Sequence, residues 1–194
     1  MKFESLKTPE TNLLISLEEL AGESPEPWLK PHGILDVFDH RLSEEEVDKT
    51  ALGGANPFIE HNLAHESKFV DFLKKAILLN GNEEIIIEAG FKGFSNQRIL
   101  QFLERLDYKE KILFLELIRN NNYTSDYLKT TDFEAVQLFL IFGTRELTFP
   151  IFHFTKYKMS LCGNFDLSFP IFFESEKVKD QYSEIARQAG LFIR

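Results

Sequence analysis

The sequence predicts an α+β fold in which a mainly helical N-terminal two-thirds packs on a small antiparallel β-meander, followed by a C-terminal helix. Two observations carry this prediction. Apolar residues recur with helical spacing over residues 60–142, and they alternate strictly with other residues over 157–161. The chain of 194 residues is 43% hydrophobic, so it can bury a sizeable core.

We expect one domain over residues 1–194, because the first third of the chain has too few apolar residues to form a core of its own. Within this domain the composition marks four successive parts. They are an acidic, loop-rich front (1–66), a helical body (67–143), a β-meander (144–174) and a C-terminal helix (175–190).

Helices are predicted where the apolar spacing is bounded by capping residues and glycines. The expected helices cover residues 11–21, 60–80, 95–106, 108–120, 131–142 and 175–190. Ser43 and Glu46 form the pattern Ser-x-x-Glu of a capping box, which predicts a further helix beginning at Glu44. The segment 83–89 fits a strand or a turn of helix equally well, and 33–40 fits a short strand or an irregular segment.

The meander is predicted from a short repeat. Leu147-Thr-Phe-Pro-Ile-Phe152 recurs 20 residues later as Leu167-Ser-Phe-Pro-Ile-Phe172. Since proline cannot donate to a strand ladder, we expect both copies to be outer strands around a central strand over 157–161. The residues expected on the buried face are Leu147, Phe149, Ile151, Tyr157, Met159, Leu161, Leu167, Phe169, Ile171 and Phe173.

The net charge of −9 lies entirely in the first third of the chain. Residues 1–66 contain 14 acidic and 5 basic residues, whereas residues 67–194 contain 17 of each. The same front holds four of the five histidines but only 3 of the 20 phenylalanines. An acidic face repels nucleic acid and attracts basic partners or cations, so we expect no nucleic-acid binding.

Other features disfavour several classes of protein. The apolar runs are far shorter than the about 20 residues that span a bilayer, and the N-terminus lacks an apolar signal segment, so we expect no membrane association. Cys162 is the single cysteine and cannot form an intrachain disulfide, which favours the cytoplasm. Glycine-rich nucleotide-binding motifs and the Gly-x-Ser-x-Gly elbow are absent from the sequence, which disfavours kinases, GTPases and Rossmann dehydrogenases.

The acidic front predicts a docking surface for a basic protein, because clustered charge speeds encounter with an oppositely charged partner and repels others. An aromatic side chain beside the acids would supply an apolar anchor, where binding energy concentrates. A solvated acidic face without a partner is the alternative. The candidate partner-binding residues are Trp28, Asp36, Phe38, Asp39, Glu44, Glu45, Glu46 and Asp48.

The histidines suggest a second kind of site. His61 and His65 are four residues apart and would share one helix face, a spacing at which two imidazoles can bind one zinc ion. Asn62 replaces the glutamate that follows the first histidine in the His-Glu-x-x-His motif, so the general base is missing. Further ligands for zinc or another divalent metal would have to come from His32, Asp36, Asp39 or His40. The alternative is that these histidines are solvated or cap helix ends.

The sequence therefore predicts a non-enzymatic, cytoplasmic protein-binding module without a cofactor. In its most specific form this is a bacterial immunity protein or antitoxin that occludes a basic, nuclease-like toxin by presenting acids in place of substrate phosphates. One alternative is a metal-dependent hydrolase that uses the cluster His32, His40, His61 and His65. Another is a structural or adaptor subunit whose edge strands pair with another chain.

Overall fold

The computed structural model describes residues 4–5, 31–49, 57–89, 94–120 and 127–194, and its fold is α+β, as predicted. Within these residues the strands form one antiparallel sheet in the order β1-β4-β3-β5-β6-β7-β2-β8. In that order the strands are Glu4–Ser5, Tyr127–Thr130, Ile85–Glu88, Ile151–Phe154, Met159–Cys162, Phe169–Phe173, His32–Asp36 and Phe192–Ile193.

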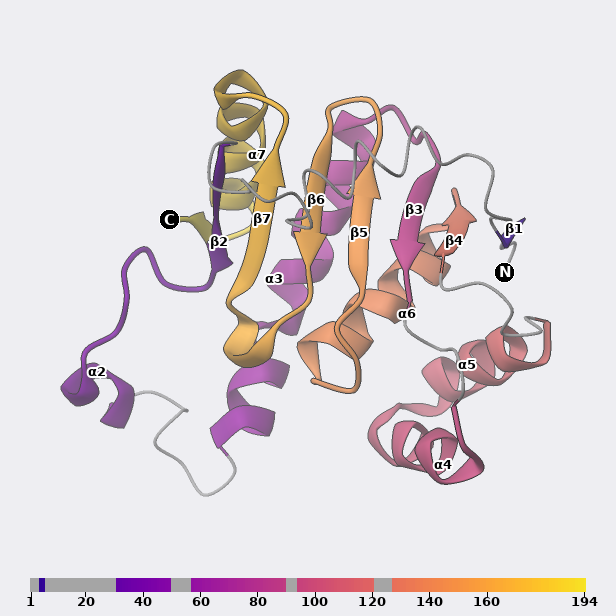
Figure 1. The fold of residues 1–194 in the computed structure, drawn as a ribbon. Helices are drawn as coiled ribbons and strands as arrows, with labels where there is room; N and C mark the ends of the chain where they lie inside the picture. Colours follow the sequence, from indigo (N-terminus) through magenta and orange to yellow (C-terminus); the bar gives the residue numbers. More distant parts are fainter. Residues whose placement is uncertain (1–3, 6–30, 50–56, 90–93, 121–126) are drawn as a thin grey trace.

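The long helices lie on one side of the sheet. Figure 1 shows α3 (Pro57–Leu79), α6 (Phe133–Thr144) and α7 (Glu176–Gln188) behind it, while α4 (Asn96–Arg105) and α5 (Tyr108–Asn120) lie together at the lower right. Helix α2 (Glu44–Asp48) stands at the lower left, apart from the sheet, at the far end of the segment that follows β2. The helix predicted over 11–21 and the residue Trp28 lie outside the described residues.

The predicted meander is present as β5-β6-β7, but it is the centre of a larger sheet. Strand β3 pairs with β5 and strand β2 pairs with β7, so the prediction that the two repeat copies are outer strands is wrong. Pro170 is tolerated because its partner in β2, Ile34, makes its backbone hydrogen bonds with Arg194 instead. Segment 83–89 is a strand, and β4 was not predicted.

The face that β5 turns to the core also differs from the prediction. Phe152 and Phe154 are fully buried in the core, whereas Ile151 is half-buried and Phe149 is exposed. The strand is therefore shifted by one residue relative to the predicted alternation, and such a shift moves every side chain to the other face. The predicted inner residues of β6 and β7 are in the core as expected.

Capping residues begin the helices where the sequence indicated. Ser95, Asp132 and Ser175 each accept a hydrogen bond from a backbone N–H in the first turn of α4, α6 and α7. The core between helices and sheet is rich in phenylalanine. Phe102 of α4 lies 5.1 Å from Phe114 of α5 and 5.0 Å from Phe142 of α6, between ring centroids, and so joins the α4–α5 pair to the core.

None of the helices in the described part of the chain is both long and apolar enough to cross a membrane.

Candidate functional site

The acidic segment of the front is held in a defined conformation at the surface. The Ser43 side chain accepts a hydrogen bond from the Glu46 backbone N–H, and the Glu46 carboxylate accepts one from the Ser43 N–H, which completes the predicted capping box of α2. Around this box Asp39, Glu44, Glu45 and Asp48 are exposed, and Glu45 pairs with Lys49. The chain therefore presents a short acidic helix to solvent.

His40 links the two halves of this segment. Its Nδ1 lies 2.6 Å from an Asp39 oxygen and its Nε2 lies 3.1 Å from a Glu46 oxygen. The hydrogen bonds with Asp39 and then Glu46 raise the pKa of His40 above its usual value. Hydrogen bonds from the Ser43 backbone and hydroxyl lower the pKa of Glu46 to about 2, so Glu46 is ionised at neutral pH.

Asp36, which the sequence placed among the partner-binding acids, is 3% exposed. Its Oδ2 accepts hydrogen bonds from the Arg194 guanidinium at 2.7 Å and from the Ser168 hydroxyl at 3.1 Å, and its Oδ1 accepts the Phe38 N–H. The carboxylate is neutralised within the chain, so it ties β2 to the C-terminal residue and does not belong to the exposed acidic surface.

The other predicted anchor, Phe38, is half-buried and stacks on His61 with ring centroids 5.8 Å apart and planes 13° apart. Beside it lies a surface pocket of about 230 Å³ that connects the acidic segment to the end of the sheet. Its lining comprises Asp36, Phe38, His40, Arg41, Leu42, Val47, Asp166, Ser168 and Arg194.

The structure brings His61 and His65 together on one face of α3, as their spacing predicted, with ring centroids 4.8 Å apart. Burial lowers the pKa of both, so both are neutral at pH 7. His32 instead lies beside Phe172, and no group of three His, Cys, Asp or Glu side chains in the described ranges could hold a metal ion. The metal-hydrolase alternative therefore gains no ligand set from these residues.

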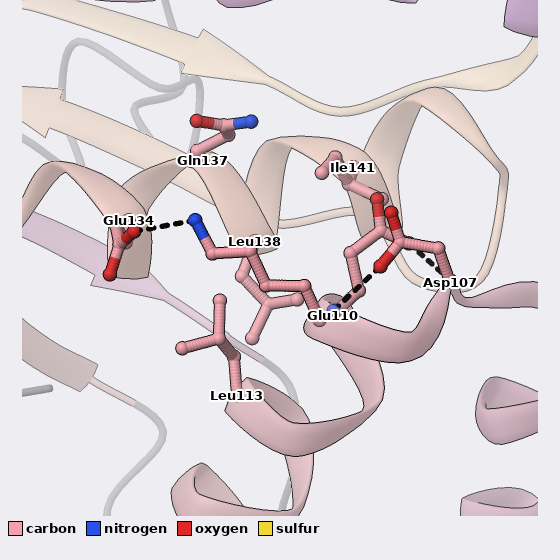
Figure 2. Close-up of a pocket in the computed structure, with 8 residues that line it drawn as sticks. Asp107, Glu110, Leu113, Glu134, Gln137, Leu138 and Ile141 are labelled. Carbon is pink, nitrogen blue, oxygen red and sulfur yellow. Dashed lines mark hydrogen bonds and ion pairs between the residues drawn. The ribbon is translucent and has the colours of Figure 1, made fainter.

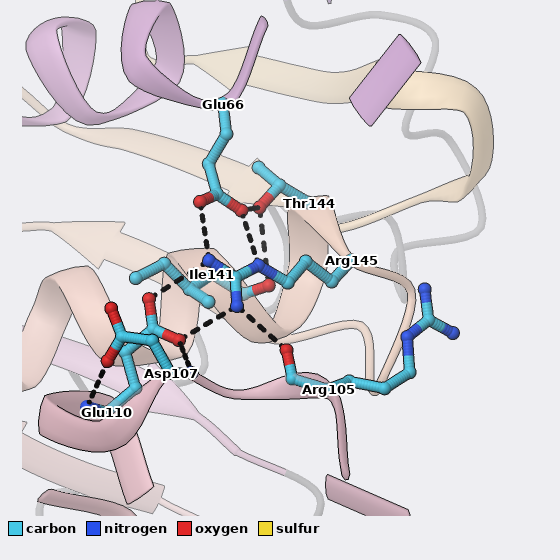
Figure 3. A network of polar contacts seen from close by, with 7 residues as sticks. All are labelled: Glu66, Arg105, Asp107, Glu110, Ile141, Thr144 and Arg145. Carbon is cyan, nitrogen blue, oxygen red and sulfur yellow. Dashed lines mark hydrogen bonds and ion pairs between the residues drawn. The ribbon is translucent and has the colours of Figure 1, made fainter. Parts of the chain in front are cut away.

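Sequence reasoning missed a buried ion-pair network just after α6 (Figure 3). The Arg145 guanidinium donates to both carboxylate oxygens of Glu66 and of Glu110, and to the backbone oxygen of Arg105. Burial disfavours its charge, but the hydrogen bonds with the two carboxylates outweigh this and raise the pKa of Arg145. The partners are 35 to 79 residues away in the chain, so no local motif signals the network.

A small cavity of about 90 Å³ lies between α5 and α6 (Figure 2). Leu113, Leu138 and Ile141 contribute apolar walls, and an ion pair of 2.6 Å between Lys109 and Glu134 joins the two helices beside it. This space accommodates about three water molecules, which is too little for a substrate.

Two exposed phenylalanines were not among the predicted binding residues, and one of them, Phe149, was expected on the buried face. Phe149 precedes β5 and Phe165 begins the 3-10 turn η3 (Phe165–Leu167); their ring centroids lie 4.5 Å apart in an edge-to-face arrangement. The next residue, Asp166, lines the pocket beside the acidic segment, and its N–H donates to Glu146. Desolvation and the nearby Glu146 raise the pKa of Asp166. An apolar pair therefore adjoins a carboxylate whose charge a cation would stabilise.

Comparison with protein-family models, with curated proteins and with solved structures found no match for this chain.

Proposed function

We propose that this chain is a non-enzymatic protein-binding module that docks a basic protein through the acidic segment 39–48. The observation that carries the proposal is the capping box, which fixes α2 at the surface with Glu44, Glu45 and Asp48 exposed. A fixed set of charges loses less conformational freedom on binding than a flexible acidic loop would.

The exposed pair Phe149 and Phe165 supplies the apolar anchor of this proposal. Phe38 fits that role less well because it already packs on His61 and the core. A rigid aromatic pair beside acidic side chains suits a basic partner, since an arginine or lysine can contact both the ring faces and the carboxylates.

In its most specific form the partner is a nuclease-like toxin, and the protein is a cytoplasmic immunity protein or antitoxin. The acids of α2 would occupy the positions of substrate phosphates and so block the toxin. The net charge of −9 supports a partner that is itself strongly basic.

The experiment is affinity purification from the native host with the wild type and a variant carrying Glu44→Gln, Glu45→Gln and Asp48→Asn. We expect a stoichiometric basic partner that the wild type retains at low salt, loses at high salt, and that this variant does not retain.

The matched control removes three exposed acids elsewhere, Glu116→Gln, Glu176→Gln and Asp180→Asn, and should keep the partner. Equal binding by both triple variants, or the absence of any stoichiometric basic partner, contradicts the proposal. Thermal unfolding of both variants checks that each is folded.

A further inference from the structure

Helix α5 carries a stripe of apolar side chains on its solvent side. Tyr108 is 81% exposed, Ile112 is 42% exposed and Leu115 is 47% exposed. Residues three and four apart are neighbours on one helix face, so these three side chains are contiguous. The opposite face, with Phe114 and Leu117, is buried in the core. A surface helix normally turns polar side chains to solvent, so an apolar stripe there indicates a contact surface.

The spacing of this stripe is that of a helix–helix interface. From Tyr108 the stripe runs through Ile112 and Leu115 to Arg119, at intervals of four, three and four residues. The same alternation of four and three marks the seam of a coiled coil. The stripe extends along the whole of α5, which is about 20 Å long. Figure 1 shows α5 at the margin of the molecule, where a second helix can lie along it.

The residues along the stripe complement a second copy of the same helix in antiparallel orientation. When two copies of α5 pair about a two-fold axis between positions 113 and 114, Ile112 of each copy lies opposite Leu115 of the other. Tyr108 then lies opposite Arg119, an arrangement in which a guanidinium can contact an aromatic ring. Lys109 and Glu116 are seven residues apart and so share one flank of the stripe. In the antiparallel pair each Lys109 approaches the Glu116 of the other copy.

The charges needed for this contact are available. Among the described residues, the side chains of Glu116 and Arg119 make no hydrogen bond or ion pair, and both are exposed. Lys109 pairs with Glu134 at 2.6 Å but is 71% exposed, and its ammonium group has three N–H donors, so it can bind a second carboxylate. Exposed ion pairs add little affinity, but they select the orientation of the two helices.

We propose that α5 forms a two-fold symmetric, antiparallel contact with α5 of a second copy of this chain. One helix pair buries less surface than the about 1,200–2,000 Å² of a standard interface, so we expect a weak dimer with a Kd of about 10–100 µM. Helix α2 lies at the other side of the molecule in Figure 1 and stays accessible in the dimer. Dimerisation is therefore independent of docking through α2.

The first test is sedimentation velocity of the full chain from about 5 to about 500 µM. The average mass of the wild type should rise from monomer towards dimer. Leu115→Asp should stay monomeric, because the contact would bury an unpaired carboxylate. Leu78→Asp is the matched control, since Leu78 is 60% exposed in the last turn of α3, and it should dimerise like the wild type. Thermal unfolding checks that both variants are folded. A wild type that stays monomeric, or equal loss in both variants, overturns the proposal.

The second test exchanges the flanking charges. Lys109→Glu and Glu116→Lys each place like charges opposite one another twice, so each should weaken self-association about tenfold. An equimolar mixture of the two variants should dimerise at least as well as the wild type, because one copy then carries two cations and the other two anions on this flank. A mixture that associates no better than its components overturns the antiparallel contact.

The triple variant of α2 described above separates this dimer from a contact between α2 of one copy and α5 of the next. It should dimerise like the wild type, because the proposed contact does not involve α2. Loss of the dimer in that variant would show that the acids of α2 bind the other copy, and it would overturn the proposal.

Discussion

The two copies of the repeated hexapeptide, 147–152 (first copy) and 167–172 (second copy), differ in one residue but turn opposite faces to the core. The phenylalanine at the third position is 40% exposed in the first copy (Phe149) and fully buried in the second (Phe169). At the sixth position the order reverses, since Phe152 is fully buried and Phe172 is half-buried. Nearly identical sequences thus adopt strands of opposite phase.

The residues that follow each copy explain the difference. The first copy continues with His153-Phe154, and the second with Phe173-Glu174. Because side chains alternate along a strand, burying Phe154 in the core requires Phe152 to face the same way and His153 to face the other. In the second copy Phe173 is buried and Glu174 is exposed, which sets the opposite phase. A short apolar motif therefore takes its orientation from its flanks.

The chain before each copy adjusts to this phase. Glu146 and Asp166, at equivalent positions, both have a left-handed backbone, with φ of 55° and 56°. In the second copy Leu167 is left-handed as well, with φ of 55°, whereas Leu147 is not. The additional left-handed residue lets both leucines reach the core although the strands that follow have opposite phases.

Alanine substitution of the phenylalanines at the third and sixth positions tests the opposite phases of the two copies with the largest expected change in stability. Phe152→Ala and Phe169→Ala should each lower the free energy of unfolding by about 3–5 kcal/mol, because each removes a fully buried ring. Phe149→Ala and Phe172→Ala should cost about 1 kcal/mol each. Urea unfolding of the four variants measures these losses. Equal losses for Phe149→Ala and Phe169→Ala, or for Phe152→Ala and Phe172→Ala, would contradict the opposite phases.

His153 follows the first copy at the position where Phe173 follows the second. Because histidine can be protonated, it should make the stability of the protein depend on pH. Burial lowers the pKa of His153 to about 4, against about 6.5 for an unfolded histidine. The contribution of neutral His153 to the free energy of unfolding is therefore complete above about pH 6.5. It falls by up to about 3 kcal/mol as the pH is lowered to about 4.

The measurement is the free energy of unfolding from pH 7 to pH 4 for the wild type and His153→Gln. The variant keeps a polar group near the Ser160 hydroxyl, which lies 2.8 Å from His153 Nδ1. We expect a shallower pH slope for the variant, and identical slopes would show that His153 does not titrate as described.

Isoleucine at the fifth position gives a smaller contrast. Ile171 is fully buried and Ile151 is half-buried. Ile171→Val should therefore cost about 1 kcal/mol and Ile151→Val less than about 0.5 kcal/mol. Chemical denaturation detects the difference, and a larger loss for Ile151→Val would reverse the assignment of the faces.

Glycine at the equivalent left-handed positions 146 and 166 should have effects of opposite sign. Asp166→Gly should raise stability by up to about 1 kcal/mol, because glycine adopts this backbone without strain. Glu146→Gly should lower it by about 1 kcal/mol, since Glu146 Oε1 accepts hydrogen bonds from Asn62 and the Asp166 N–H. Thermal unfolding compares the two; a gain in stability at both positions would mean that backbone strain dominates at both, and a loss at both would mean that Asp166 carries no such strain.

Much of the fold was readable because its signals are local. The capping residues and the apolar spacing identified the described helices, and the alternation over 157–161 identified β6. Strand β4 and the choice of a strand at 83–89 were not readable, because these short segments form strands only by pairing with neighbours. The pairing of His61 with His65 followed from helix geometry, whereas the ion pair of Asp36 with Arg194 joins residues 158 apart.

The sequence by itself determined the α+β class, the helix starts, the acidic character of the front and the surface helix α2. These features depend on side-chain spacing, on caps within a few residues and on charge, all of which are local properties. Only the tertiary structure decided the phase of the two hexapeptide copies, the interior position of their strands, the burial of Asp36 and the network around Arg145. Each of these depends on which distant segment packs beside a residue, and burial and pairing energies follow from that contact rather than from the local chain.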